Sequence, residues 1–498
     1  MRILIWHGWL LEGSGSNVGT ARVAEAWRSA GHDVALVCQE RHPERYPWID
    51  AAATVDERGV GPGVDAGPGR CVLLRPEIGP TLPVFVVDRY EGFDDVRRFP
   101  DLTDEELERY LAANVGALRA VAAWHGSDVV VTGHAIPGAV IGRRALGPGR
   151  YVSKIHGSDI EYAVRVQDRL RELAREGLGG ARAVLGPTAE VLERCAGLVP
   201  EMRELGRIVA PGVDVAAFRP RRRAEALTEV ADRLDADHDT ARGRPADTDA
   251  MVAAALDARD AAALDAIAET YDQAVPEPGA ADRLRDLADR RAPIVGYLGK
   301  LIPQKGVELV LAAQVQLAHD AEALIVGFGA HREWLAALAI ALRRADPAAL
   351  AWVREAGSMP IGEAGGGGTG RRVTFTGRLD HRYAPGTLAA MDVLVVPSIL
   401  EEAFGMVAAE GAAAGALPLV ARHSGLAEVA AALEAEVGRP GLFSFEPGSG
   451  SVDRVASAID GLLGLPAETR SELRDGVSAF VGREWTWDRT AARILAAW

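Results

Sequence analysis

The feature that most constrains the fold is an alternation, repeated in both halves of the chain, of short apolar runs with Ala/Leu/Arg segments of helical period. This pattern is typical of βα units that stack into a parallel sheet. In the first half it predicts strands at residues 2–6, 33–37, 84–87, 129–132, 151–155, 183–185 and 207–210, and helices at 18–30 and 104–124. In the second half it predicts strands at 294–298, 323–326, 372–376, 393–396, 417–420 and 442–445, and helices at 307–317, 332–344 and 404–414. The chain is therefore expected to be an α/β protein with two doubly wound, Rossmann-like domains.

The expected domain boundaries follow from changes in residue composition and in the predicted secondary structure along the chain. Residues 1–212 form the first domain and 293–475 the second, while 476–498 form a C-terminal helix expected to pack back on the first domain. Residues 221–292 are rich in Ala, Asp and Arg and lack strand signals, which predicts a helical insertion. We interpret it as a tolerated addition to an exposed connection in preference to a lid or a partner surface. A glycine run at 365–368 predicts a flexible loop.

Charge and cysteine content narrow the class of protein. The 498 residues include 55 Lys and Arg against 70 Asp and Glu, a formal charge of −15, which argues against nucleic acid as a partner. Cys38, Cys71 and Cys195 have no paired spacing and favour a reducing compartment. The first eleven residues contain one strand-like run and not the ~20 apolar residues of a membrane span. We therefore expect a cytoplasmic protein.

Lysine is rare in this chain. Of the 55 basic residues only Lys154, Lys300 and Lys305 are lysines. They are either survivors by chance or positions where a compact, rotatable ammonium is needed and a planar guanidinium does not fit.

Two of these lysines lie in one loop. Gly299-Lys300 follows a predicted strand, and Lys305-Gly306 precedes a predicted helix. Two ammonium groups beside a helix N-terminus can neutralise the charge on a departing nucleoside diphosphate. Because no cluster with metal-ligand spacing accompanies them, we expect metal to be dispensable.

A second loop connects the strand that ends at Pro397 to the next helix. Its exit places backbone N–H groups at a helix N-terminus, a site suited to a diphosphate or to sugar hydroxyls. The residues concerned are Phe404, Gly405, Met406 and Val407. Glu402 and Glu410, eight positions apart, can point toward one ligand, so the loop predicts two acceptors for two sets of hydroxyls.

Together these motifs resemble those of family 4 of the retaining GT-B glycosyltransferases, over nearly the whole chain except the insertion. The matching segments are Gly299-Lys300-Leu301 with Lys305-Gly306, Val326-Gly327-Phe328-Gly329, Phe375-Thr376-Gly377-Arg378, Glu402 to Glu410, Pro211-Gly212-Val213-Asp214 with Phe218-Arg219-Pro220, and Trp485-Thr486-Trp487-Asp488. One departure is Lys300, where the family usually has Arg.

The resemblance implies a GT-B architecture, in which two domains face each other across a cleft, and a retaining, NDP-sugar-dependent hexosyltransferase without cofactor. It implies that Lys300 and Lys305 bind the donor diphosphate and that Glu410 holds the ribose. It also implies that Glu402 contacts the donor sugar, and that Gly377 and Arg378 hold the base. The acceptor is expected to be a small molecule, a lipid-linked molecule or a glycan.

The first half supplies further candidates at predicted strand ends. Gly15 and Asn17 lie in a Gly-rich loop expected to approach the donor phosphate or the acceptor. By resemblance, His134 contacts the donor sugar near the reaction centre, and His156 lies in a motif that faces the acceptor. Lys154 precedes His156 by two positions. We assign Asn17, Lys154 and His156 to the acceptor side.

Two clues concern the acceptor and the membrane. Lys154 with Arg143 and Arg144 suits a phosphorylated acceptor, although the two arginines equally fit a solvated helix face. The basic segment at 163–174 suits weak peripheral contact with an anionic membrane, although its interleaved acids favour an ordinary surface helix.

The alternatives are a nucleotide-sugar epimerase or hydrolase of the same fold and a non-catalytic nucleotide-binding Rossmann protein. A dehydrogenase would need G-x-G-x-x-G, and the spacing of Gly13, Gly15 and Gly19 does not supply it. A phosphorylase would need a pyridoxal lysine, and two of the three lysines are already assigned to phosphate.

Overall fold

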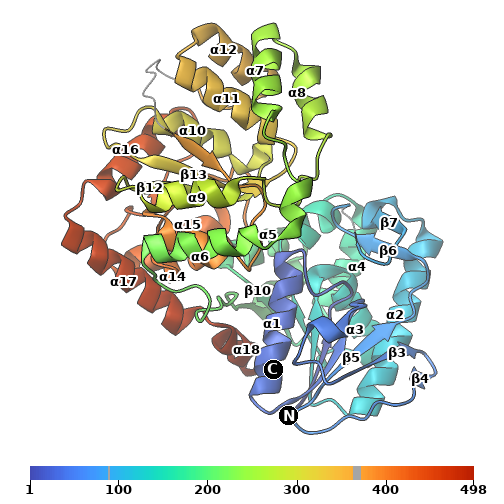
Figure 1. The fold of residues 1–498 in the computed structure, drawn as a ribbon. Helices are drawn as coiled ribbons and strands as arrows, with labels where there is room; N and C mark the ends of the chain where they lie inside the picture. The colour runs from blue at the N-terminus through green and yellow to red at the C-terminus, as the bar shows by residue number, and fades with distance from the viewer. Residues whose placement is uncertain (88–89, 363–371) are drawn as a thin grey trace. The chain divides into compact units, whose positions relative to one another are not determined.

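The computed structural model describes residues 1–87, 90–362 and 372–498 (Figure 1). The chain divides into two compact units. The first unit comprises Met1–Gly212 and Trp485–Trp498, and the second comprises Val213–Glu484. The glycine run at 365–368 lies outside the described residues.

The first unit is built on a nine-stranded sheet of order β11-β10-β9-β8-β1-β2-β5-β3-β4. Its strands are β1 (Arg2–Trp6), β2 (Asp33–Val37), β3 (Ala51–Asp56), β4 (Gly59–Val60), β5 (Cys71–Pro76), β8 (Val129–Gly133), β9 (Val152–Lys154), β10 (Ala183–Gly186) and β11 (Gly206–Ile208). All neighbours pair in parallel except β3 and β4. The central strands β1 and β2 are apolar and almost entirely buried, as expected for a parallel sheet covered on both faces.

The helices of the first unit follow the strands. They are α1 (Gly15–Ser29), α2 (Asp104–His125), α3 (Ala139–Leu146), α4 (Asp168–Leu178), α5 (Ala189–Leu198) and α18 (Trp487–Ala496). At the start of α2, Thr103 and Glu106 form a capping box. Helix α18 packs on α1, where the Trp27 Nε1–H donates to Ala491 O at 3.1 Å.

Two predictions in the first half are wrong. The strand expected at 84–87 is instead β6 (Thr81–Val84), which pairs with β7 (Asp95–Arg98) outside the main sheet, and Val86 and Val87 are exposed. The loop expected through Asn17 is also shorter. The Ser14 side chain caps α1, so Gly15 and Asn17 lie in the first helical turn.

The second unit has a six-stranded parallel sheet of order β14-β13-β12-β15-β16-β17. Its strands are β12 (Ile294–Lys300), β13 (Glu322–Phe328), β14 (Val373–Phe375), β15 (Val393–Val396), β16 (Leu417–Ala421) and β17 (Ser444–Phe445). Its helices beyond residue 300 are α10 (Val307–Gln314), α11 (Arg332–Arg344), α12 (Pro347–Ala356), α13 (Ala384–Ala390), α14 (Met406–Ala413), α15 (Ser424–Glu436), α16 (Ser451–Leu463) and α17 (Ala467–Glu484). Strand order changes direction at β12 and β15, and the open end of such a sheet is where ligands bind in this type of fold.

The segment 221–292 is helical as expected but is not a surface addition. It contains α6 (Arg223–Asp235), α7 (Thr248–Ala258), α8 (Ala261–Ala268) and α9 (Ala280–Ala288). Helix α6 packs on α9 and α13, and the Arg244 guanidinium makes two bonds of 2.8 and 2.9 Å to the fully buried Glu333 carboxylate of α11. A buried ion pair of this kind leaves an uncompensated charge if one partner is removed. The segment is therefore part of the second unit's core, and the interpretation as a tolerated addition is wrong.

The expected boundary at residue 475 is also wrong. Helix α17 runs through it to Glu484 and packs on α14 and α15, where the Ser478 hydroxyl donates to Ala413 O at 2.9 Å. Only the last fourteen residues, Trp485–Trp498, join the first unit. The break comes where Thr486 caps a new helix, α18.

In the described parts of the chain, none of the helices combines the length and the apolar character that crossing a bilayer requires.

Candidate functional site

In the second unit, the two predicted loops meet at the carboxyl ends of β12 and β15. The Ile399 N–H of the loop after β15 donates to Gln304 O of the loop after β12 at 2.8 Å. Gly306 has φ +65°, and a Cβ there would lie 2.4 Å from Pro397 O, so only glycine fits this crossing. The motifs that the sequence shows almost a hundred residues apart therefore form one continuous structure.

The centre of this structure is an ion pair between Lys305 and Glu402. The Lys305 ammonium contacts Glu402 Oε1, and the Ser398 hydroxyl donates to the same oxygen at 2.9 Å. Both charged side chains are about three-quarters buried, with 28% and 24% exposure. Without ligand, the positive charge of Lys305 is thus balanced by an acid from the neighbouring loop.

Residues that sequence reasoning gave no role hold Glu402 in place. The Glu402 backbone N–H donates to Ser424 Oγ at 2.9 Å, and the His423 Nε2 lies 2.7 Å from Ser398 O. Ser398 directly follows the predicted strand end at Pro397, whereas His423 and Ser424 lie at the start of α15, where the sequence analysis predicted no site.

Helix α14 begins beside the ion pair. Gly405 adopts φ +94°, and a Cβ at this position would lie 2.4 Å from Leu426 Cδ2. The next residues, Met406 and Val407, open the helix and are partly exposed, while Phe404 is buried beneath them. This arrangement presents the predicted backbone N–H groups at a helix N-terminus.

Glu410 lies one turn further along α14. Burial raises its pKa to about 8, and its side chain is 12% exposed. The His381 Nε2 is 4.0 Å from its Oε1. At neutral pH the free protein therefore holds Glu410 mainly as the neutral acid, which a ligand able to donate hydroxyl hydrogen bonds would help to ionise.

A second buried acid, Glu308, lies near the start of α10. Burial raises its pKa to about 7, and within the described residues neither of its oxygens contacts a hydrogen-bond partner in another residue. It lies two positions after Gly306 in the sequence, but nothing in its spacing distinguishes it from an ordinary first-turn acid.

The other predicted donor residues lie on either side. Lys300 is exposed at the end of β12, immediately after Gly299. The Arg378 guanidinium lies over the Phe328 ring at 5.1 Å, while its backbone N–H donates to Val275 O at 3.3 Å. The carbonyl of Gly377 accepts from Gly327 N–H at 3.0 Å. The Arg378 Nη1 also donates to Ala274 O at 3.4 Å, so both the main chain and the side chain of this turn make contacts within the second unit.

In the first unit, the predicted residues gather around His7, which follows β1. The His7 Nε2 lies 2.9 Å from Asn17 Oδ1, and its Nδ1 lies 3.1 Å from Thr20 Oγ1. The His134 ring centroid is 5.9 Å from that of His7 and 4.5 Å from that of His156. His7 was missed because a single histidine after a first strand has no distinctive spacing.

His134 adopts a rare backbone conformation. It has φ +73° and is 1% exposed, with its ring packed 4.5 Å from Trp9 and 5.1 Å from Phe85, measured between centroids. A non-glycine residue in the left-handed region is strained, and such strain is concentrated at functional sites. His134 directly follows the last residue of β8, Gly133.

The electrostatics of this cluster are set by burial. Burial lowers the pKa of His7 to about 4 and that of Lys154 to about 8. It also lowers the pKa values of His134 and His156 well below the ordinary range, with the Lys154 charge acting in the same direction. The cluster at neutral pH therefore holds three neutral imidazoles and one ammonium.

Three of the other basic residues considered for the first unit form ion pairs on its surface. Arg144 pairs with Glu108 and Glu176 at 2.9 Å. Arg165 pairs with Glu161, and Arg171 with Asp168. These pairs favour the solvated-face interpretation for both segments.

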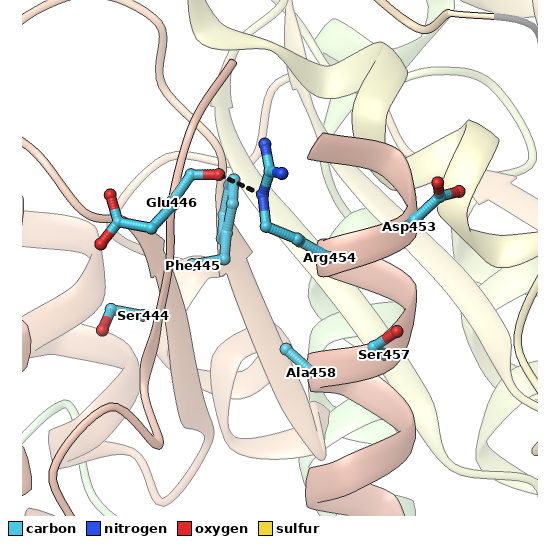
Figure 2. Close-up of a pocket in the computed structure, with 7 residues that line it drawn as sticks. All are labelled: Ser444, Phe445, Glu446, Asp453, Arg454, Ser457 and Ala458. Atoms are coloured by element: carbon cyan, nitrogen blue, oxygen red, sulfur yellow. Dashed lines mark hydrogen bonds between the residues drawn. The ribbon is translucent and has the colours of Figure 1, made fainter. Parts of the chain in front are cut away.

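A separate shallow pocket lies beside β17 and α16 (Figure 2). Its residues are Ser444, Phe445, Glu446, Asp453, Arg454, Ser457 and Ala458. The Arg454 Nε donates to Glu446 O at 2.6 Å, the bond drawn in Figure 2. None of the predicted site residues belongs to this pocket. Across the described residues, no three His, Cys, Asp or Glu side chains are grouped so that they could hold a metal ion.

Comparison with known proteins gives one family match, which lies within the second unit. Residues 292–464 match the family described as Glycosyl transferases group 1, so the match covers the second unit's sheet. The 2-deoxystreptamine glucosyltransferase of Streptomyces kanamyceticus is 29% identical over 223 residues, 44% of this chain and 47% of the relative. The D-inositol 3-phosphate glycosyltransferase of Mycobacterium tuberculosis is 28% identical over 256 residues, 51% of this chain and 47% of the relative. The chain thus spans about half the length of these curated relatives.

Among solved structures, the complex of Anabaena HepE with UDP is similar over the whole chain. It covers 100% of this chain and 99% of its own, with a TM-score of 0.58 and 14% identity. The complex of the same protein with UDP-glucose has a TM-score of 0.56 at 14% identity and covers 100% and 98%. This likeness concerns the fold, and it confirms the predicted GT-B architecture of two Rossmann-like units.

Proposed function

We propose that the chain transfers a hexosyl group from a nucleoside-diphosphate sugar to an acceptor hydroxyl, as a member of family 4 of the retaining GT-B glycosyltransferases. The main support for this proposal is the arrangement of Lys305 and Glu402. The contact of Lys305 with Glu402, beside the N-terminus of α14, brings together a cation for phosphate and an acid for sugar hydroxyls.

The proposed role of Lys305 is to stabilise the leaving group. Glycosyl transfer passes through an oxocarbenium-like state in which negative charge grows on the leaving phosphate. The ammonium of Lys305 and the N-terminus of α14 both favour negative charge at that position. When the diphosphate binds, Lys305 exchanges the Glu402 carboxylate for phosphate oxygens. The released carboxylate can then accept hydrogen bonds from the donor sugar.

The proposed role of Glu410 is to hold the ribose. A carboxylate accepts two hydroxyl hydrogen bonds, and neighbouring ribose hydroxyls provide them. Because burial raises the pKa of Glu410 to about 8, ribose binding is coupled to loss of its proton below that pH. Arg378, lying over Phe328, is the proposed contact for the flat base.

We propose no cofactor and no metal, because Lys300 and Lys305 supply positive charge where other enzymes use a divalent ion. The acceptor is a small molecule, a lipid-linked molecule or a glycan, bound by the first unit. Two relatives are named for 2-deoxystreptamine and D-inositol 3-phosphate, which supports a small molecule. The three free, buried cysteines support a reducing, cytoplasmic setting.

The test is to incubate the protein with UDP-glucose and a panel of alcohols, and to follow UDP release and the anomeric configuration of the product by NMR. We expect acceptor-dependent UDP release with retained configuration. Release of free sugar alone, or a changed sugar configuration without transfer, would instead identify the alternative hydrolase or epimerase. Absence of UDP and UDP-glucose binding in calorimetry would contradict the choice of donor tested.

A further inference from the structure

Lys154 lies at the end of β9, and no acidic side chain among the residues that the structure describes pairs with it. A Cβ on Gly19 of α1 would lie 3.7 Å from the Lys154 Nζ, so the ammonium lies against this helix. Among the described residues no hydrogen bond or ion pair to it is found, and its lowered pKa has burial as its cause. Lys305, by contrast, has Glu402. Burying an ammonium without a partner costs folding free energy, and a bound ligand with negative charge would offset this cost.

The groups around Lys154 also have unused hydrogen-bonding capacity. Within the described residues, the buried Nδ1 of His134 and the buried Nε2 of His156 have no hydrogen-bond partner. Each imidazole nitrogen can donate when it carries the proton. Lys154 and His156 are partly exposed, whereas His134 is buried, so a ligand approaches the cluster at Lys154 and His156.

The acid in this cluster is already engaged. Asp159 accepts hydrogen bonds from the backbone N–H groups of Ala135 at 2.7 Å and of His156 and Ile160 at 3.1 Å each. It therefore cannot serve as the counter-ion of Lys154 without losing these bonds. The cluster thus offers one positive charge and two imidazole nitrogens to a ligand that brings negative charge and several acceptor oxygens.

We infer that Lys154, His134 and His156 form a binding site for a phosphoryl group in the first unit. Phosphate fits because it presents three acceptor oxygens to the three nitrogen groups, whereas a carboxylate presents two. The inference rests on the proposed function, since it names a group that one of the substrates carries. That substrate is either a phosphorylated acceptor or the nucleoside-diphosphate donor, which share this chemistry.

The first experiment is calorimetric titration of the full chain with inorganic phosphate at pH 7. We compare wild type, Lys154→Met and, as the matched control in the second unit, Lys305→Met. Loss of a charged hydrogen-bond partner should weaken phosphate binding at least about tenfold in Lys154→Met. The Lys154-dependent binding should remain in Lys305→Met. Equal phosphate affinity in wild type and Lys154→Met, or no phosphate binding to wild type at millimolar concentration, would overturn the inference.

The melting temperature of Lys154→Met distinguishes a binding role of Lys154 from a purely structural one. Because the ammonium has no partner, Lys154→Met should melt at or above the wild-type temperature without phosphate, whereas a structural lysine would lower it. Lys154→Arg keeps the charge but not the shape of the ammonium, so its phosphate affinity should lie between those of wild type and Lys154→Met. If Lys154→Met does not fold, Lys154→Gln serves in its place with the same expected loss of phosphate binding.

A second titration identifies the source of the phosphoryl group. Phosphate that still binds in the presence of saturating UDP identifies a phosphorylated acceptor. Phosphate that UDP displaces, together with weaker UDP binding to Lys154→Met, identifies the donor diphosphate. Failure of wild type to bind UDP would count against the proposed function alone, because the phosphate titration does not depend on it.

Discussion

Each unit has a lysine near the carboxyl ends of its parallel strands, but the two lysines have opposite electrostatic surroundings. In the second unit, Lys305 is paired with Glu402, which arrives from the loop of the neighbouring strand. In the first unit, Lys154 lies among His7, His134 and His156, and its charge acts on each of these imidazoles. The charge of Lys305 is thus balanced by an acid, whereas the charge of Lys154 is not.

The difference shows how the surroundings of a lysine set its readiness for a ligand. A preformed pair keeps Lys305 charged and oriented, and the ligand has to replace the Glu402 carboxylate. An unpaired ammonium such as Lys154 loses proton affinity through burial, and its pKa falls to about 8. A ligand can then restore its charge without displacing any group.

The largest expected effect comes from Lys305→Ala. Removing one preorganised group that stabilises the leaving phosphate should cost about 3 kcal/mol of transition-state stabilisation, or more than about 100-fold in kcat. Turnover of UDP-glucose under saturating donor measures it. Arg454→Ala, which removes a cation from the separate pocket of Figure 2, is the matched control and should stay near wild type. Near-normal kcat in Lys305→Ala would show that the paired lysine does not act on phosphate.

The two units should also respond oppositely to pH. The pKa of Glu410 is raised from 4.5 to about 8, so the folded state keeps a proton that the unfolded state loses, and this group lowers stability as pH rises from about 4.5 to 8. The pKa of Lys154 is lowered from 10.5 to about 8, so the unfolded state keeps the extra proton, and stability rises with pH from about 8 to 10.5.

Glu410→Gln and Lys154→Met isolate these contributions. Relative to wild type, each should change the free energy of unfolding by about 1 to 3 kcal/mol across its own pH window and little outside it. Denaturant unfolding at pH 5, 8 and 10 measures the differences. Parallel pH profiles for both variants and wild type would mean that neither group is desolvated as the structure shows.

Glu410→Gln should also weaken binding of the nucleotide part of the donor. The amide keeps the size of the side chain but loses the charge, so the affinity for UDP should fall about tenfold. Wild-type affinity should rise with pH up to about 8 as Glu410 ionises, whereas the variant should show no such rise. Calorimetry at pH 6, 7 and 8 measures both effects, with Glu436→Gln on α15 as a control. A pH-dependent rise that persists in Glu410→Gln would assign it to another group.

Much of the fold could be predicted because its signals are local. Apolar runs located β1, β2, β12 and β15, and helical period located α11 with the bounds that the structure has. The strand β3 was missed because its Ala-rich sequence reads as helical, and β6 was displaced because the apolar run continues past its last paired residue. Local patterns do not show where pairing stops, since that depends on the neighbouring strand.

The candidate sites could be predicted in part, for the same reason. Strand ends and glycine turns pointed to Lys305, Glu402, His134 and Lys154, because parallel strands end at one edge of a sheet. The sequence could not show that Lys305 has a counter-ion while Lys154 has none within the described part of the chain, because that depends on distances between loops. Nor could it show that segment 221–292 contributes Arg244 to a buried pair with Glu333.

The smallest expected effect is that of removing or adding divalent metal ions on the turnover of UDP-glucose. If Lys300 and Lys305 supply the charge that stabilises the leaving diphosphate, then EDTA should leave the turnover of UDP-glucose unchanged within error, and added Mg²⁺ should not raise it. The measurement also extends the comparison of the two lysines. Lys305→Ala should gain some activity from Mg²⁺, because a divalent ion can replace the missing charge at the phosphate, whereas Lys154→Met should gain none if its phosphoryl group is on the acceptor. A strict requirement of the wild type for Mg²⁺ would mean that the lysine pair does not suffice for the charge of the leaving group.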